Sequence, residues 1–338
     1  MLILSNSLTQ SADEGSLKLA SSLVKRIKNK YPENTYIVSF EREFPQGDEH
    51  LSLNKLHISR RLISLIKKQK VLYIPFPAPT TSMAVRIFLL SLFARRGLRV
   101  MMIRQYPMNR AAQALLRFSG AELVVFSKKA CDYYSPIVNG RVQYLKTGVD
   151  TEKFKPVSAQ KARELKIKYG FDPESPIVLH VGHMKEGRNV AELTKIDKKY
   201  QVLLVVSTLS KERQNPELRE RLLKHPNIRI MEGYIPCIEE IYQMCDVYFF
   251  PVKQMGHCID VPLSCLEAAA CNKPIITTDY GEMAEFAGIN GISFIDEINE
   301  NTINENIEKL LQQKDLNIRD SVLNYDFDKA IEYLFNGN

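Results

Sequence analysis

The chain has 338 residues, 45% apolar and 25% charged, which is the composition of an ordinary soluble protein with enough apolar material for two sizeable cores. Its net charge of +7 is uneven, because residues 1–156 hold 25 Lys and Arg against 11 Asp and Glu. The most apolar window (83–96) contains arginines and the first ten residues lack a basic leader region, so we expect a cytoplasmic protein without a spanning helix or signal peptide.

Short β-rich apolar runs and helical patterns alternate along the whole chain. Near-continuous apolar strands separated by helices predict parallel sheets that are covered on both faces. The fold class predicted is therefore α/β, with two Rossmann-like doubly wound domains that face each other across a cleft. The strands are expected at residues 2–5, 35–40, 71–76, 99–103, 122–126, 142–146, 176–182, 201–207, 228–233, 246–252, 274–278 and 292–295.

The first strand is followed by the loop SNSLTQSADEGS, which contains a single glycine, Gly15. A dinucleotide-binding enzyme would carry G-x-G-x-x-G at this point, so the loop argues against an oxidoreductase of that kind. Two interpretations of Gly15 stay open. It provides flexibility at a helix start, or it belongs to a loop that grips an acceptor.

The amino-terminal half also carries an unbalanced charge. No acidic residue lies between Glu49 and Glu122, whereas that interval contains thirteen Lys or Arg, several beside bulky apolar residues as in RIFLLSLFARRGLR (86–99). A solvated basic surface is one interpretation. The pattern favours a face for phosphates or an anionic membrane, with the protein peripheral at the inner leaflet. Nucleic acid is not an expected partner, because the chain has no stacking-aromatic or nucleic-acid motif.

The strand pattern lapses in TGVDTEKFKPVSAQ (147–160), which marks a seam between domains. We expect an amino-terminal, acceptor-side domain at residues 1–155 and a carboxyl-terminal donor domain at 156–318. The aromatic-rich segment 319–338 is predicted to be a helix that packs back toward the amino-terminal domain. Oligomeric state cannot be inferred from these patterns.

The stretch HVGHMKEGRNV (180–190) ends a buried strand and is predicted to open a helix. Glycines such as Gly182 let a ligand approach the backbone, and a helix start favours anions. His183, Lys185 and Arg188 add cations at the carboxyl end of this strand, which favours a phosphate site over a solvated basic turn. His180 and His183 form H-x-x-H without a third ligand, so no metal is expected.

A lone carboxylate, Glu267, stands in IDVPLSCLEAAACNKPIITT (259–278). Ser264-x-x-Glu267 fits a capping box, in which both side chains satisfy amides at the helix start. The same helix start would also suit a diphosphate, with Glu267 accepting hydrogen bonds from ribose hydroxyls. The local pattern leaves both interpretations open.

Four stretches in order resemble the retaining family-4 glycosyltransferases of GT-B fold, the glycosyl transferases group 1. They are GVDTEKFKP (148–156), HVGHMKEGRNV (180–190), EGYIPCIEEIYQMCDVYFFP (232–251) and VPLSCLEAAACNKPIITTDYGEMAEF (261–286). The resemblance implies a retaining glycosyltransferase of hexosyltransferase type that needs no metal or other cofactor. It would use a nucleotide diphosphate sugar, UDP- or GDP-linked, as donor substrate, and a glycan or lipid-linked phosphate as acceptor, in cell-surface glycan or glycolipid synthesis.

The resemblance also assigns roles by position. Glu267 matches the glutamate that binds the donor ribose. Arg188 matches the second of two cations that clamp the diphosphate, His183 stands in place of the first, and Lys185 could compensate. The family's earlier glutamate falls at Ile259, so Asp260, offset by one, is the nearest carboxylate for the donor sugar. The remaining donor-side positions, several of them through their backbone, are Gly182, Tyr234, Ile235, Val261, Leu263 and Ser264.

The amino-terminal half offers no histidine at a strand end, since neither His50 nor His57 sits there. Its acceptor-side candidates are Gly15 and Arg104, Gln105 and Tyr106, which follow a predicted strand. Two alternatives to a transferase remain. One is a nucleotide-sugar epimerase of the same fold, and the other is a non-catalytic module that binds a nucleotide or a partner.

Overall fold

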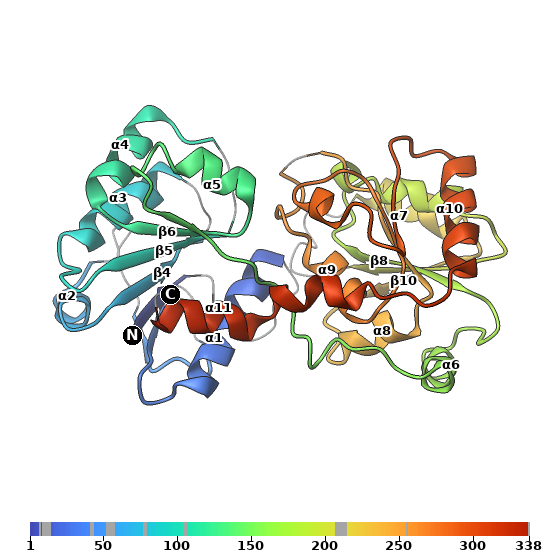
Figure 1. Cartoon of the computed structure of the whole chain (residues 1–338), viewed down its shortest axis with the longest axis horizontal. Helices are drawn as coiled ribbons and strands as arrows, with labels where there is room; N and C mark the ends of the chain where they lie inside the picture. The colour runs from blue at the N-terminus through green and yellow to red at the C-terminus, as the bar shows by residue number, and fades with distance from the viewer. Residues whose placement is uncertain are drawn as a thin grey trace. The chain divides into compact units, whose positions relative to one another are not determined.

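The computed structural model describes residues 1–6, 8, 15–40, 44–51, 58–76, 80–103, 107–206, 215–254 and 256–336. The chain divides into two compact units, which Figure 1 draws as separate α/β bodies. Unit 1 comprises Met1–Thr147 and Phe327–Asn338, and unit 2 comprises Gly148–Asp326. Each unit is a parallel sheet with helices on its faces, so the predicted fold class is confirmed.

The sheet of unit 1 has seven strands in the order β3-β2-β1-β4-β5-β6-β7. All of its pairings are parallel, as expected for strands that are apolar on both faces. The order reverses between β1 and β4, which is the switch point of a doubly wound sheet. The strands are β1 (Leu2–Ser5), β2 (Tyr36–Ser39), β3 (Glu49–His50), β4 (Val71–Ile74), β5 (Leu98–Met102), β6 (Glu122–Val125) and β7 (Val142–Tyr144).

Several helices of unit 1 begin at a short polar side chain. Ser59, Thr80, Asn109 and Ser127 each accept a hydrogen bond from an amide of the first turn, which satisfies a donor that the helix itself cannot. The helices of this unit are α1 (Gly15–Lys30), α2 (Arg60–Ile66), α3 (Thr81–Ser91), α4 (Arg110–Ser119), α5 (Lys128–Tyr134) and α11 (Phe327–Asn336).

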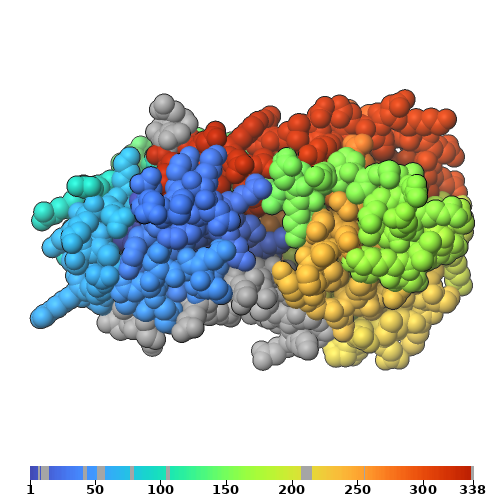
Figure 2. All heavy atoms as spheres, turned by 90° about the horizontal axis from the view of Figure 1, so that it is seen from below, coloured from blue at the N-terminus to red at the C-terminus, as the bar shows by residue number. Residues whose placement is uncertain are grey.

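The last helix of the chain, α11, packs within unit 1 on α1, and Figure 2 shows the red atoms of α11 beside the blue atoms of α1. The rings of Tyr31 and Phe335 stack at 4.1 Å between centroids. Lys30 pairs with Glu332 at 3.0 Å, and an Nη atom of Arg99 donates to the Leu334 carbonyl at 2.8 Å. These contacts tie the end of the chain to the amino-terminal sheet.

Unit 2 contains a six-stranded parallel sheet in the order β10-β9-β8-β11-β12-β13. The order reverses between β8 and β11. The strands are β8 (Ile177–Gly182), β9 (Gln201–Val206), β10 (Ile228–Glu232), β11 (Val247–Phe250), β12 (Ile275–Thr277) and β13 (Ile292–Phe294). The α-helices are α6 (Ala159–Lys168), α7 (Pro216–Leu223), α8 (Ile238–Met244), α9 (Leu263–Ala270) and α10 (Glu300–Gln312), and the short 3-10 helices are η1 (Glu186–Arg188), η2 (Val190–Lys195), η4 (Met283–Phe286) and η5 (Arg319–Tyr325).

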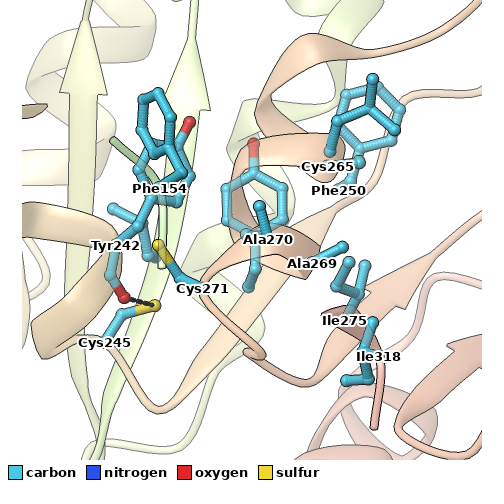
Figure 3. Close-up of a cluster of buried hydrophobic side chains, with 14 of the residues drawn as sticks. Phe154, Tyr242, Cys245, Phe250, Cys265, Ala269, Ala270, Cys271, Ile275 and Ile318 are labelled. Carbon is cyan, nitrogen blue, oxygen red and sulfur yellow. Dashed lines mark hydrogen bonds between the residues drawn. The ribbon is translucent and has the colours of Figure 1, made fainter. Parts of the chain in front are cut away.

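Helix α9 lies on this sheet through a face of small residues. Cys265, Ala269 and Ala270 are buried there among aromatic and branched side chains, as Figure 3 shows for Phe250 and Ile275. Small side chains let the helix approach the strands closely, and the aromatic rings fill the remaining space. This packing fixes the start of α9 with respect to the ends of the strands.

The segment expected to link the domains is structured within unit 2. Val149 is buried and bridges Asp326, and the Asp326 carboxylate accepts from the amide and the hydroxyl of Thr151 at 2.9 and 2.6 Å. The segment 319–338, expected to be one helix, instead contains η5 and α11 on either side of this bridge. The backbone of Asp326 is extended (ψ 144°), which ends η5 before α11 begins.

Candidate functional site

In a doubly wound sheet, ligands bind beyond the carboxyl ends of the strands where the strand order reverses. In unit 2 this point lies between β8, which ends at Gly182, and β11, which ends at Phe250. The loop after β8 carries Arg188, and the loop after β11 leads into α9. Most of the residues predicted for the donor site therefore come from these two loops and from α9.

Gly182 and Arg188 are in direct contact. A Cβ atom on Gly182 would lie 2.4 Å from an Nη atom of Arg188 and 3.1 Å from Nε2 of His180. The glycine therefore makes room for the guanidinium at the end of β8, and Arg188 is only 8% exposed there. Sequence reasoning selected both residues, and the structure brings them together.

His180 lies under this contact in the strand itself. Burial lowers the pKa of His180 to about 4, helped by the charge of Arg188 and opposed by the hydrogen bond to the Phe249 carbonyl, which raises it. The neutral ring donates from Nδ1 to the Phe249 carbonyl at 2.8 Å. Its Nε2 atom then carries a lone pair on the side of Arg188 and has no hydrogen-bond partner within the described part of the chain. His180 is thus an uncharged neighbour of the guanidinium rather than a competing cation.

The segment after β8 does not open an α-helix, and this expectation is wrong. It forms the short turns η1 and η2, because Asn189 between them adopts a left-handed conformation with φ 53°. The predicted anion site at the start of a regular helix is therefore absent from this described segment. Phosphate binding here would depend on side chains and on the glycine backbone.

Instead, this loop is joined to the loop after β11. Nε of Arg188 donates to the His257 carbonyl at 3.0 Å, and the side-chain amide of Asn189 donates to the Pro251 carbonyl at 2.8 Å. Gly187 lies against the His257 ring, since a Cβ atom there would come within 2.2 Å of it. The two loops thus form one structure at the switch point.

The start of α9 excludes the capping box. Pro262 occupies the N-cap position, and no side chain caps the helix. Ser264 lies inside the first turn, so its hydroxyl is not placed to accept from the third amide. The first helical bonds run from the amides of Cys265 and Leu266 to the Pro262 carbonyl. The amides of Leu263 and Ser264 precede them, and this end of the helix favours an anion.

Glu267 is buried in the second turn of α9, with 2% of its surface exposed. It lies close to Tyr242 of α8, where burial and then the Glu267 carboxylate raise the pKa of the phenol. A charged group in such surroundings requires polar partners. The ligand interpretation of Glu267 remains a prediction, while its role in a capping box is wrong.

The other predicted residues are distributed over the molecule. His183 is buried, Lys185 and Asp260 are half-buried, and Val261 and Leu263 are buried so that only their backbone can meet a ligand. Tyr234 is exposed after β10, and Ile235 packs against the core. Gly15 begins α1 in unit 1. Arg104, Gln105 and Tyr106, and likewise His57, lie outside the described residues.

Sequence reasoning missed His257 and Tyr280. Tyr280 is buried, and its hydroxyl bonds to both backbone groups of Cys258. His257 lies outside the four stretches that resemble the family, and Tyr280 lies in the last of them without a role assigned by the resemblance. The one sequence feature that could have indicated this contact is the glycine at position 281. In the structure its φ is 59°, and it lies against the backbone of Asp260.

In the described part of the chain, no group of three His, Cys, Asp or Glu side chains could hold a metal ion. Among the described helices, none is both long enough and apolar enough to cross a membrane. All six cysteines are free thiols.

Comparison with known proteins agrees with this geometry. Residues 175–313 match the family model of the glycosyl transferases group 1. No curated protein matches the chain in sequence. Among solved structures, a glycosyltransferase from Rickettsia africae ESF-5 superimposes with a TM-score of 0.77 at 14% identity, covering 99% of this chain and 97% of its own. The Anabaena protein HepE in complex with UDP-glucose gives 0.73 at 13% identity over 100% of both chains.

A third structure, sucrose-phosphate synthase from Thermosynechococcus elongatus, gives a TM-score of 0.71 at 14% identity, covering 100% of this chain and 98% of its own. The full-length likenesses and the two doubly wound units define a protein of GT-B fold. Residues 175–313 belong to the glycosyl transferases group 1.

Proposed function

We propose that the chain transfers a glycosyl group from a nucleoside diphosphate sugar to a glycan or lipid-linked acceptor in the synthesis of a cell-surface glycan or glycolipid. The observation that carries this proposal is the placement of Arg188. Its guanidinium lies over Gly182 at the end of β8, where the sheet order reverses, and its Nε is anchored on His257. A fixed cation at that position suits the diphosphate of the donor.

The remaining donor contacts follow from what each group can bind. Lys185 and His183 add positive charge after β8, and the amides of Leu263 and Ser264 face an anion at the start of α9. The Glu267 carboxylate would accept from ribose hydroxyls. Asp260 would accept from the sugar, and the backbone at Tyr234 and Ile235 would read the base.

In the reaction, the bond between the anomeric carbon and the diphosphate oxygen breaks as the acceptor oxygen bonds to that carbon. The departing diphosphate gains negative charge, which Arg188 and Lys185 would stabilise more than they stabilise the intact donor. The acceptor proton would pass to the departing diphosphate. Because Arg188 is held by the fold before the donor arrives, little reorganisation of this cation is needed during the step.

A uridine diphosphate sugar is the first donor to test. This choice is supported by the Anabaena protein, whose solved structure contains UDP-glucose and matches this chain over its full length. We expect the purified chain to release UDP or GDP from one member of a panel of UDP- and GDP-sugars when acceptor is present. NMR of the product should show the anomeric configuration of the donor.

The same experiment separates the alternatives. Epimerised donor without any acceptor would identify an epimerase. Binding of a nucleotide, without release of nucleoside diphosphate or transfer of sugar from any donor in the panel, would identify a binding module. That alternative is supported by Ile259, which is buried at the position where the family has a carboxylate. Either outcome would contradict the proposed transferase.

We assign the acceptor to unit 1 and place an anionic membrane at its α3–α4 face. Helices α3 and α4 pack side by side with their first turns joined, since the Asn109 side chain donates to the Thr81 hydroxyl at 2.8 Å. The two helices are of similar length, so their last turns also end together. The α3–α4 face is defined by the exposed residues at that end: Leu92, Arg95, Arg96, Arg117 and Phe118.

This face has the composition of a surface that binds anionic lipid. Leu92 is 59% and Phe118 76% exposed, so two large apolar side chains stand among the arginines of this face. Each arginine near an anionic leaflet contributes about 1 kcal/mol. Burial of one large apolar side chain contributes about 1.5–3 kcal/mol. Together these contributions are sufficient for reversible attachment.

The chain is expected to float with vesicles that contain anionic lipid and to detach as salt is raised. Replacing both Leu92 and Phe118 by serine should abolish flotation. The matched control is Leu223→Ser, which removes an exposed leucine of α7 in unit 2. Equal recovery on neutral and anionic vesicles, insensitive to salt, would contradict the membrane assignment.

A further inference from the structure

The segment His257–Asp260 is held by its backbone from two sides. The His257 carbonyl accepts from Arg188 at 3.0 Å, and the Asp260 carbonyl accepts from the Glu282 amide at 2.9 Å. Between them, both backbone groups of Cys258 are bonded to one side chain, Tyr280. Four polar backbone groups of a four-residue stretch therefore have partners that lie far away in sequence.

Tyr280 makes the central contact. Its hydroxyl donates to the Cys258 carbonyl at 2.6 Å and accepts from the Cys258 amide at 3.0 Å. The ring is fully buried and packs edge-on against Phe250 at the end of β11, with 5.8 Å between centroids. Burial raises the pKa of Tyr280 far above its usual range, so the hydroxyl keeps its proton. One side chain thus connects the core of the sheet to the loop that precedes α9.

The next residue, Gly281, brings two backbones together. Its φ of 59° is in the left-handed region, and a Cβ atom there would lie 2.0 Å from the Asp260 carbonyl oxygen. Only glycine allows this approach. Residues 280–282 therefore form a continuous support for residues 258–260.

What this support holds in place is the carboxylate of Asp260. At the position where the family has a glutamate, this chain has Ile259, whose apolar side chain is buried and offers no polar group to a ligand. Asp260 is half-buried at the same loop, between the Tyr280 contact and the start of α9. A carboxylate displaced by one residue can serve the same sugar only if its backbone is fixed, because an error of about 1 Å is costly in such sites.

We propose that Tyr280 is a positioning residue that fixes the Cys258 peptide and thereby holds Asp260 against the donor sugar. This inference rests on the proposed function. The two side chains hold different peptides, since Arg188 is bonded to the His257 carbonyl and the Tyr280 hydroxyl to the backbone of Cys258. Its effect should therefore fall on the sugar half of the donor.

The test is Tyr280→Phe, which removes both hydrogen bonds and keeps the ring. We expect the KM for the donor sugar to rise about tenfold, since each lost hydrogen bond is of modest strength. Binding of the nucleoside diphosphate without sugar should stay within about threefold of wild type, because the diphosphate contacts are intact. If Tyr280 had only a structural role, Tyr280→Phe would weaken the binding of the donor sugar nucleotide and of the nucleoside diphosphate equally. That result would overturn the proposal.

Two further variants complete the design. Tyr325→Phe is the matched control, because Tyr325 is buried in the same unit and donates to Glu285 at 2.7 Å away from the loop. It should leave the donor KM unchanged. Asp260→Asn should raise the donor KM as Tyr280→Phe does, and the double variant should be no worse than either single one. Full additivity of the two changes would overturn the proposal.

Failure of the inference and failure of the proposed function give different results. If the chain were no transferase, the wild type would release nucleoside diphosphate from no donor in the panel. If only the role of Tyr280 were wrong, the wild type would be active and Tyr280→Phe would have the same donor KM. The wild-type measurement therefore precedes the comparison of variants.

Discussion

Replacing Arg188 by alanine is expected to lower turnover by about 10²–10³, equivalent to about 2.7–4 kcal/mol of lost transition-state stabilisation. The guanidinium is fixed before the donor arrives, by Gly182 below it and by the His257 carbonyl at 3.0 Å. Its loss removes charge from the point where the departing diphosphate becomes more negative. Steady-state kinetics with the selected donor and acceptor would measure the effect.

The matched control for Arg188→Ala is Arg163→Ala. Arg163 lies on the surface of the same unit, where it pairs with Glu174, and exposed ion pairs contribute little. We expect its turnover to equal that of the wild type. If the turnover of Arg188→Ala were within a few-fold of the turnover of Arg163→Ala, the proposed role of Arg188 in binding the diphosphate would be wrong.

Glu267→Gln is expected to weaken nucleotide binding roughly 10- to 150-fold. A hydrogen bond to a charged group contributes about 1.5–3 kcal/mol, and each 1.4 kcal/mol corresponds to about a factor of ten in affinity. Glutamine keeps the shape of the side chain on α9, so the melting temperature should change little. Calorimetric titration with the nucleoside diphosphate, beside thermal unfolding, would measure both quantities.

Glu285→Gln provides the comparison for this second variant. Glu285 is half-buried in the same unit and accepts from Tyr325, so its replacement also removes a charge-assisted hydrogen bond. We expect nucleotide affinity to be unchanged in Glu285→Gln. A Glu267→Gln protein with intact affinity and a large loss of stability would show that Glu267 serves packing against Tyr242 instead.

The sheets were predictable because each strand can be recognised from the few residues that form it. Runs such as VLYI and VYFF are apolar at every position, as strands covered on both faces must be, and both became buried parallel strands. The convergence of Gly182 and Arg188 was also predictable in outline, since the two residues flank one loop. In each case the information lies within a few residues.

The errors and omissions arose where distant contacts decide the local structure. The pattern after β8 suggested a helix, but Asn189 adopts a left-handed conformation and its side chain is held by Pro251, 62 residues away. The prediction of a capping box was wrong because Pro262, not Ser264, occupies the N-cap position of α9. Tyr280 bonds to Cys258 across 22 residues, and Arg188 to His257 across 69. No periodicity in the sequence encodes such pairs.

The central claim is that the end of β8 in unit 2 binds a diphosphate through Arg188. Its most direct test is calorimetric titration of wild type and Arg188→Ala with the nucleoside diphosphate and monophosphate, in both the uridine and the guanosine series. Wild type is expected to bind one diphosphate at least about tenfold more tightly than its monophosphate, as one charge-assisted contact requires. In Arg188→Ala this preference should fall by about tenfold, the contribution of one charge-assisted contact, while affinity for the monophosphate is retained. An undiminished preference in Arg188→Ala would show that Arg188 does not bind the diphosphate.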